Sequence, residues 1–491
     1  MSVYEPEGPP RLGWDMIKRF ALGGVLIVAL SAVAVSTGLL LEVHDSINII
    51  ERESTPIPGV SNVLDDVAGG GPKTILVLGS DRRYGEDKSA TPRSDTIIVV
   101  RLDPEKGATA TMSIPRDLQV EIPGYGTDKI NAAYANGGPK LTVATVKDLL
   151  GIDINHVINV NFGGFQRAVN RLGCVYADID RRYFNANGGP DGYATIDLEA
   201  GYQRLCGKDS LDFVRYRHTD NDFVRGARQQ EFLRQAKDQI GLGKVFGDRK
   251  GLLTIFGRYT QTDIAERNDA AILRLIKLAY DSSKNPLTEV PFPAEDTSDG
   301  NVEISIENLQ KTIDRFIDVR GSQKSENAEK PKPKTIKRRK GGLAPGLVMR
   351  KRQGEDHVLN IAAKLRSLPV YFPGAILGRQ GYVRDSPRAY TIRARNKKLY
   401  RAYRLVLSQG DDGQYYGVQG TTWKAAPILD NPTDTVRMRK RTYMRFFDGR
   451  KIRMIAWRTP KAAYWVSNTL TRNLTNRQML DIARSLQRIG Q

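Results

Sequence analysis

Charged side chains gather at the ends of three short apolar stretches in the first third of the chain. The stretches are Thr74–Leu78, Thr96–Leu102 and Ala110–Ile114. Short β-branched runs of this kind are typical of strands buried on both faces. The charged residues at their ends are Asp81, Arg82, Arg93, Asp95 and Arg116. If the strand ends converge, these residues form one site for a divalent cation and a phosphate.

The residue types match that chemistry. Carboxylates are hard oxygen ligands, and one or two of them together with phosphate oxygens suit Mg²⁺. Guanidinium groups bind phosphate oxygens through two parallel hydrogen bonds, which a lysine ammonium cannot do. Taken singly, each of these residues could equally be a solvated charge at a strand end, paired with a neighbour. Their ordered succession favours a site.

Five motifs in this part of the chain resemble the catalytic domain of the LytR-CpsA-Psr (LCP) family. They are LGSDRR at Leu78–Arg83, RSDT at Arg93–Thr96, SIPRD at Ser113–Asp117, KINAAYA at Lys129–Ala135 and FVRYRHTDNDFVRGARQQ at Phe213–Gln230. The resemblance spans about Lys73 to Arg320 and implies an α/β fold, with an α-β-α sandwich as catalytic domain. It also implies phosphotransfer of a glycopolymer from a polyprenyl-pyrophosphate carrier to peptidoglycan. The implied cofactor is Mg²⁺, for which Mn²⁺ could substitute.

The resemblance and the chemistry of the residues together give expected roles for individual residues. Asp81 and Asp95 would hold the metal, and Arg93 and Arg116 would be catalytic. By resemblance, the pyrophosphate-binding set contains Arg93, Arg116, Arg215, Arg217, Arg225 and Gln229. Arg82 and Lys129 are expected to bind the same group. Asp222 is chosen as the base from its place beside the arginines, and a helix cap is an equal alternative. Lys129 could instead be a solvated loop lysine, and Arg228 and Gln230 are better explained as a charged helix surface.

Local patterns place these residues on expected elements. A strand is expected over Phe213–His218, where the period of two puts Arg215 and Arg217 on one face. A helix should begin near Gly226, and Arg225 and Gln229 share its face if Arg225 is already helical. Lys129 should lie on a loop ahead of a helix over Pro139–Leu150. A strand at Val157–Phe162 and a helix at Phe165–Leu172 should follow.

The N-terminal segment predicts a membrane anchor. Residues 1–19 are polar, and Phe20–Leu41 carries no charge over a length of roughly 33 Å as a helix, enough for one bilayer crossing. Basic residues precede it and acidic residues follow it, so the N-terminus should be cytoplasmic and the rest extracytoplasmic. A cleaved signal peptide is the alternative. Residues 42–72 are expected to be a linker.

Outside the membrane the compartment is oxidising, so the two cysteines, Cys174 and Cys206, should form a disulfide. The chain has 491 residues and a net charge of +20. A basic surface of this kind favours binding to nucleic acid, anionic lipid or anionic wall polymer. The predicted topology favours wall polymer or lipid, and no nucleic acid is expected.

The remaining chain divides into three predicted parts. Residues 73–320 should complete the catalytic domain, and the basic, proline-rich residues 321–350 should be a disordered linker. Residues 351–491 should form a separate small α+β domain of unknown role. In that domain Asp448-Gly449 predicts a hairpin turn, and Thr475 to Gln478 form a capping-box pattern at the start of the last helix.

Two classes of function follow. The first is an enzyme, either the transferase or a hydrolase that cleaves the pyrophosphate link of the same lipid at the same site. The second is a non-catalytic wall-binding or regulatory protein, which the basic linker and the unassigned last domain would suit.

Overall fold

The computed structural model describes most of the chain beyond the N-terminal 44 residues. The described residues are 45, 47–65, 71–80, 94–186, 195–216, 222–240, 247–264, 267, 269–283, 285, 287–297, 301–320, 334–335, 342–365, 367–378, 381–409, 414–438 and 441–490, without the side chains of 95, 222, 223, 269, 283, 296, 334 and 335. Within these residues no helix is both long and apolar enough to cross a membrane. The predicted anchor at residues 20–41 lies outside them.

The first unit is built on a mixed seven-stranded sheet. Its order is β1 (Thr55–Pro56), β12 (Thr260–Thr262), β7 (His156–Asn161), β2 (Lys73–Ser80), β3 (Ser94–Asp103), β4 (Ala108–Ile114) and β13 (Leu287–Glu289). Strand β2 runs antiparallel to β3 and parallel to β7. The three apolar stretches of the sequence are therefore the neighbouring strands β2, β3 and β4.

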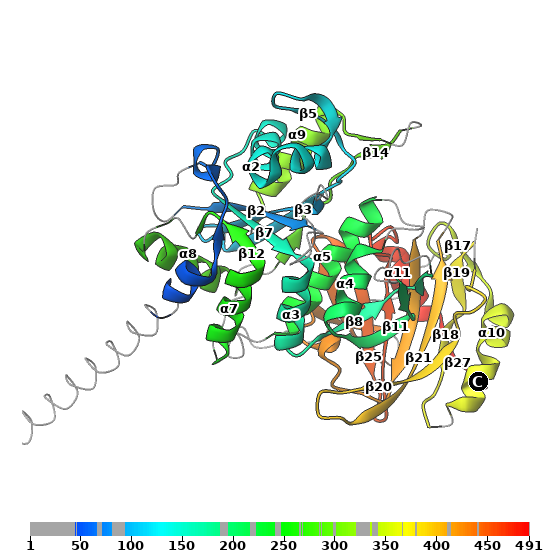
Figure 1. Ribbon diagram of the computed structural model, residues 1–491. Coiled ribbons are helices and arrows are strands. Elements are labelled where there is room, and N and C mark those ends of the chain that lie inside the picture. The colour runs from blue at the N-terminus through cyan, green and yellow to red at the C-terminus, as the bar shows by residue number, and fades with distance from the viewer. Residues whose placement is uncertain are drawn as a thin grey trace, which may run out of the picture.

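Helices cover both faces of this sheet, because alternate residues of the central strands are buried on opposite sides. Leu76, Val99 and Met112 form one core with α2 (Ile130–Leu150) and α9 (Ile306–Ile317). On the other face, α5 (Asp222–Gln239) and α8 (Asp269–Ser283) contact Thr111 and Thr109 through hydrogen bonds. Figure 1 shows the sheet edge-on between α2 and α9 above and α7 (Arg249–Tyr259) and α8 below.

A second unit follows in the chain and contains a larger, mostly antiparallel sheet. Its eight strands lie in the order β16 (Lys334–Thr335), β23 (Asp434–Met438), β24 (Arg441–Asp448), β25 (Lys451–Arg458), β26 (Ala463–Ser467), β22 (Tyr415–Thr421), β21 (Leu399–Ser408) and β20 (Arg388–Arg393). Helices α10 (Lys351–Lys364) and α11 (Asn476–Ser485) pack their apolar side chains on it. The predicted capping box at Thr475 and Gln478 is confirmed.

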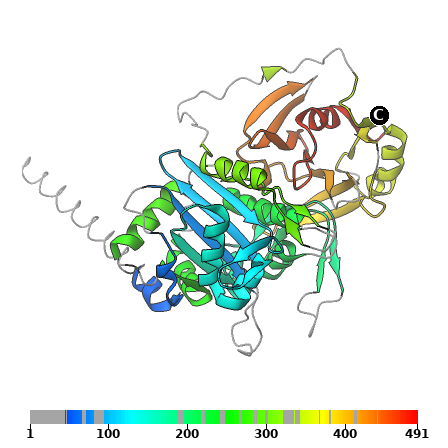
Figure 2. The ribbon, with the colours of Figure 1, turned by 90° about the horizontal axis from the view of Figure 1, so that it is seen from above.

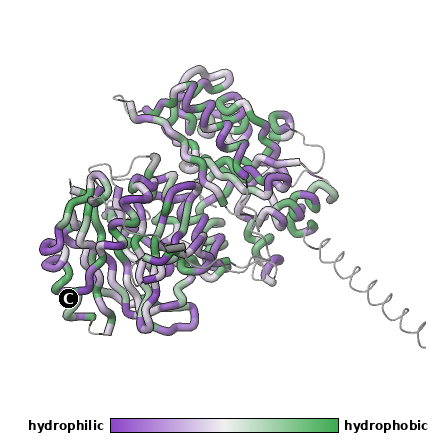
Figure 3. The backbone as a smooth tube through the Cα atoms, turned by 180° about the vertical axis from the view of Figure 1, so that it is seen from behind, coloured by the Kyte–Doolittle hydropathy of each residue, from purple (hydrophilic) through white to green (hydrophobic). Residues whose placement is uncertain are grey.

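Small elements connect the two units. Strands β8 (Val175–Ile179) and β11 (Gly201–Leu205) pair antiparallel, and Val175 lies opposite Leu205. Cys174 and Cys206, just beyond that pair, form the predicted disulfide with Cα atoms 4.5 Å apart. Tyr176 and Tyr202 of these strands pack into one apolar cluster with Trp465 of the second sheet. The two units therefore lie side by side (Figures 1 and 2), with hydrophobic and hydrophilic segments alternating along both (Figure 3).

Four local predictions do not hold. Phe213–Arg215 is not strand but the last turn of α4 (Gly207–Arg215), in which Gly207, Ser210 and Leu211 are buried at helical spacing. Lys129 ends a short strand, β6 (Gly126–Lys129), and α2 begins directly after it, with a kink at Gly138 before Pro139. Helix α5 starts at Asp222 and not near Gly226. Arg225 is therefore already helical and lies one turn before Gln229 on the same helix. The hairpin forms, but Asp448 pairs with Lys451, so its turn is Gly449-Arg450.

Parts of both predicted linkers are folded. Ile47, Ile50, Ile57 and Val60, in the segment 42–72, are buried against the first unit. Leu347–Met349 forms a strand, β17, that pairs with β19 (Ala375–Leu377) of the second unit. The sequence did not predict these contacts, because the apolar residues of each segment are scattered among prolines and charges and form no regular helix or strand pattern.

Candidate active site

Three strand ends meet at one edge of the first sheet. Gly79 of β2 lies opposite Thr96 of β3, and Ile97 of β3 lies opposite Ile114 of β4. Neighbouring antiparallel strands put the end of one beside the start of the next. The last residue of β2, the first residues of β3 and the last residue of β4 therefore lie at the same edge.

A β-bulge interrupts the pairing at this edge. Thr96 pairs with Gly79 and Ser94 pairs with Ser80, so Asp95 is an extra residue on β3. The Ser94 hydroxyl donates to the carbonyl oxygens of Thr96, at 3.0 Å, and Gly79, at 3.4 Å, and so bridges the bulge. Bulges redirect side chains and are common beside active sites. The backbone irregularity thus falls on a residue that the sequence assigns to the metal.

Arg116 follows β4 and is held by Asp117. The Arg116 Nε atom lies 3.5 Å from one Asp117 carboxylate oxygen, and Lys129 Nζ lies 3.9 Å from the other. The Asn131 side-chain amide also donates to Asp117, at 3.4 Å. The Asp117 carboxylate therefore contacts Arg116, Lys129 and Asn131 at once and holds them close together. No local pattern in the sequence indicates this role for Asp117, although the residue stands inside the SIPRD motif.

Helix α5 supplies two further members of the predicted set. Arg225 and Gln229 are one turn apart and both are buried, at 5% and 6% exposure. Gln229 Nε2 donates to Thr96 Oγ1 of β3, at 3.0 Å, and to the Val214 carbonyl oxygen of α4, at 3.2 Å. Gln229 thereby ties the end of the sheet to both helices. At Gly226 an added Cβ would lie 3.2 Å from Ser113 Oγ, so the glycine permits the close approach of α5 to β4.

Arg215 approaches the same edge from α4. Its guanidinium lies over the Phe162 ring, 4.3 Å from the ring centre. Phe162 begins α3 (Phe162–Arg171) directly after β7, whose last residue, Asn161, pairs with Ser80. The tertiary structure thus brings Arg215 to the strand ends although it is on a helix and not on the predicted strand.

Two other residues of α5 have structural roles. Arg228 is fully buried, donates to the Tyr216 carbonyl oxygen and stacks 4.7 Å from the Tyr183 ring centre. Gln230 is also buried and accepts a hydrogen bond of 2.6 Å from Thr111. The interpretation of these two residues as a charged helix surface is therefore wrong.

The described part of the site is strongly cationic. It places Arg116, Lys129, Arg215 and Arg225 around one edge, with Asp117 among them. Asp81, Arg82, Arg93 and Arg217 lie outside the described residues, and the side chains of Asp95 and Asp222 are not described. Among the side chains that are described, no group of three or more histidines, cysteines and carboxylates could hold a metal ion. Clustered guanidinium groups suit an anion such as phosphate.

Comparisons with known proteins identify relatives of this chain. The chain is 30% identical over 283 residues to a polyisoprenyl-teichoic acid–peptidoglycan teichoic acid transferase TagU of Oceanobacillus iheyensis, a match that covers 55% of this chain and 83% of that relative. It is 37% identical over 218 residues to the TagU of Bacillus anthracis, covering 43% and 66%. A solved structure of YwtF (TagT), a Bacillus subtilis protein, with bound octaprenyl pyrophosphate is 25% identical, with a TM-score of 0.39, and the match covers 51% and 92%.

A family model extends over the same part of the chain. The model of the LytR_cpsA_psr family matches residues 45–317, which include the whole first sheet and every residue of the site. This protein belongs to the LytR_cpsA_psr family.

Proposed function

We propose that this protein is a phosphotransferase that moves a glycopolymer from a polyprenyl-pyrophosphate carrier onto peptidoglycan. The observation that carries the proposal is the cluster of Arg116, Lys129, Arg215 and Arg225 at one sheet edge in a member of this family. Relatives named as teichoic acid transferases indicate an anionic polymer such as teichoic acid as the cargo.

The reaction requires little covalent chemistry from the protein. A peptidoglycan hydroxyl oxygen attacks the phosphorus that carries the glycopolymer, and the bond from that phosphorus to the bridging oxygen breaks. Polyprenyl phosphate leaves with the bonding electrons, and the hydroxyl proton passes to a base, for which Asp222 is our choice. Arg93, Arg116 and Arg225 offset the charge on the transferred and leaving phosphates. Arg82, Lys129, Arg215 and Arg217 bind the same pyrophosphate, and Gln229 positions it.

Asp81 and Asp95 fit a divalent cation by donor type. They are hard oxygen ligands, and in the sequence they directly follow Ser80 and Ser94, which pair at the ends of β2 and β3. Mg²⁺, or Mn²⁺ in its place, would there supply positive charge to the pyrophosphate oxygens.

We further propose that the protein acts outside the membrane, anchored by Phe20–Leu41 with a cytoplasmic N-terminus. The Cys174–Cys206 disulfide supports an oxidising compartment. The α-β-α sandwich of the catalytic domain and a small α+β domain after it would then both be extracytoplasmic.

The decisive experiment measures transfer of labelled glycopolymer from lipid-linked donor to peptidoglycan. Arg116→Ala should reduce turnover by roughly 10²–10³-fold, as removal of one charged contact at a transition state often does. Arg315→Ala is the matched control, because Arg315 is exposed on α9. Release of glycopolymer phosphate without attachment to peptidoglycan would identify a hydrolase. Equal transfer by Arg116→Ala and Arg315→Ala would refute the assignment of the site.

A further inference from the structure

A cavity lies beside the candidate site, between the two units. Its volume is about 310 Å³, near the lower limit for pockets that bind small molecules. Ser113, Pro115 and Gly226 line it from the first unit, and Asp448, Lys451 and Leu470 line it from the second. Neither unit alone would enclose this space.

The cavity adjoins the proposed phosphate ligands. Pro115 immediately precedes Arg116, and Gly226 immediately follows Arg225. The close approach of Gly226 to Ser113 brings α5 to the end of β4 at this position. Whatever occupies the cavity is therefore next to the pyrophosphate in the proposed reaction.

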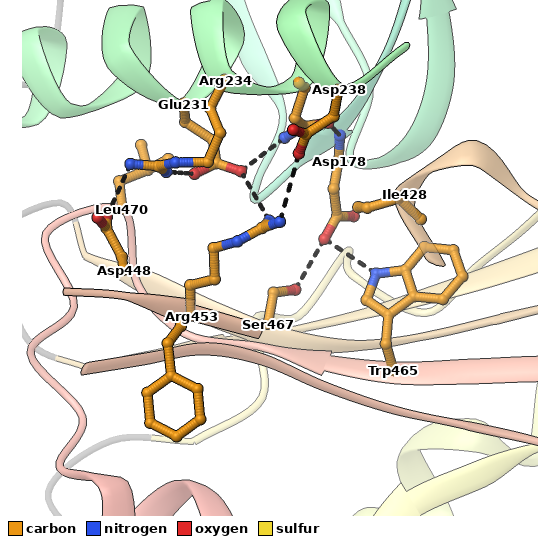
Figure 4. Close-up of polar contacts among 12 residues, drawn as sticks. Asp178, Glu231, Arg234, Asp238, Ile428, Asp448, Arg453, Trp465, Ser467 and Leu470 are labelled. Atoms are coloured by element: carbon orange, nitrogen blue, oxygen red, sulfur yellow. Dashed lines mark hydrogen bonds and ion pairs between the residues drawn. The ribbon is translucent and has the colours of Figure 1, made fainter. Parts of the chain in front are cut away.

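Buried ion pairs fix the wall that the second unit contributes. Arg234 of α5 donates to Asp448 Oδ2, at 2.8 Å, and Arg472 forms an ion pair with Glu231 of α5. Arg453 of β25 approaches Glu231 to 3.6 Å. Figure 4 shows the side chains of Arg234 and Asp448 converging below α5, with Leu470 beside them. Breaking one partner of a buried pair leaves an uncompensated charge, so these contacts favour a single docked arrangement.

The lining discriminates among the three groups that meet at a pyrophosphate in this reaction: a prenyl chain, the donor glycan and the acceptor glycan. Four ionisable residues line the cavity, Glu289, Asp448, Lys451 and Arg472, beside apolar residues that include Val290 and Phe292. Asp448 is already paired with Arg234 and Arg472, and Lys451 donates to the Arg472 carbonyl oxygen. A prenyl chain would add no hydrogen bond to these groups and would remove the remaining water from them, which is costly. A sugar offers hydroxyls to these charged groups and to Ser113. It also offers an apolar ring face to Pro115 and Leu470.

We propose that the second unit completes a saccharide subsite in this cavity, adjacent to the pyrophosphate. The proposal rests on the proposed function. The sugar is either the one attached to the donor pyrophosphate or the acceptor sugar of peptidoglycan, and both offer the same hydroxyl-rich chemistry.

The test places a bulky side chain in the cavity by substituting a lining residue of the second unit. Lys451 begins β25, lines the cavity and donates to the Arg472 carbonyl oxygen at 3.3 Å, whereas Lys461 is exposed beyond the opposite end of the same strand. Lys451→Trp and Lys461→Trp therefore make the same change inside and outside the subsite. The measurements are the Kd of octaprenyl pyrophosphate, the Kd of octaprenyl pyrophosphate bearing one N-acetylhexosamine, and the KM for a short peptidoglycan fragment.

Lys451→Trp should bind the sugar-free lipid as the wild type does. It should weaken binding of the sugar-bearing lipid by about tenfold or more if the subsite takes the donor sugar. If the subsite takes the acceptor sugar, the KM for the peptidoglycan fragment should rise by a similar factor instead. Lys461→Trp should change neither. Lys451→Met, compared with Lys461→Met, repeats the test without added bulk if the tryptophan disturbs folding.

Two results would overturn the inference. The first is that the Lys451 variants match the Lys461 variants in both saccharide measurements. The second is that the sugar-free lipid loses as much affinity as the sugar-bearing lipid, which would make the cavity a lipid site. A wild-type protein that neither binds octaprenyl pyrophosphate nor transfers glycopolymer would contradict the proposed function itself.

Discussion

Asp178 should be one of the most sensitive positions for the stability of the joined units. This β8 residue is 8% exposed, and its carboxylate accepts hydrogen bonds from three side chains of the second sheet. The donors are Arg404 Nη1 at 3.1 Å, Trp465 Nε1 at 3.0 Å and Ser467 Oγ at 2.9 Å. Asp178→Ala removes a contact between the units and leaves these three donors without their carboxylate acceptor. Figure 4 shows the contacts from Trp465 and Ser467.

The expected magnitude follows from the burial of the partner. The Arg404 side chain is 0% exposed, so without Asp178 its charge would be buried and uncompensated. Removal of one partner of a buried ion pair typically costs about 3–5 kcal/mol. We expect Asp178→Ala to lower the free energy of unfolding by about 4 kcal/mol. Asp178→Asn, which keeps an acceptor oxygen, should cost about half as much.

Urea unfolding, followed by tryptophan fluorescence, would measure the effect. The control is Asp197→Ala, because Asp197 pairs with Arg182 at 2.8 Å while both side chains are half exposed. Exposed pairs contribute about 0–1 kcal/mol, so this variant should unfold close to the wild type. Arg404→Met in the Asp178→Ala background should recover stability, because it removes the uncompensated charge. Equal losses for Asp178→Ala and Asp197→Ala would refute the reasoning.

Three further predictions concern the disulfide, pH and the metal. Replacing both Cys174 and Cys206 by serine should lower the free energy of unfolding by roughly 3.5–4 kcal/mol, since their sequence separation is 32; an unchanged urea midpoint would contradict this. Burial raises the pKa of Glu289 to about 7 despite the nearby Arg234. The folded state then binds more protons than the unfolded state between about pH 4.5 and 7, and stability should fall across that window by on the order of 3 kcal/mol. Glu289→Gln should flatten this decline. An equally steep decline of stability with pH in the variant would show that another titrating group causes it. A chelator should abolish transfer and added Mg²⁺ restore it, and Asp81→Ala should lose about 10²-fold or more in turnover; full transfer in chelator would end the metal-assisted mechanism.

The sequence alone predicted the features that depend on local pattern and on residue chemistry. Short β-branched runs predicted β2, β3 and β4, because a strand buried on both faces needs little beyond its own apolar side chains. The capping box predicted the start of α11. The oxidising compartment and the even cysteine count predicted the disulfide. The motifs predicted the family, and with it the catalytic chemistry that we propose.

The tertiary structure decided what depends on packing between distant segments. Phe213–Arg215 has strand-like residues, yet it ends a helix because Gly207 and Leu211 bury the same face of α4. Arg228 resembles a surface residue of a charged helix, yet it is buried because Tyr183 and Tyr216 surround it. The contact between the units depends on Asp178 and Glu231, whose partners in the second unit, Arg404 and Arg472, lie more than 200 residues away. No local pattern can specify such pairs, because charged residues this far apart meet only once both sheets have formed.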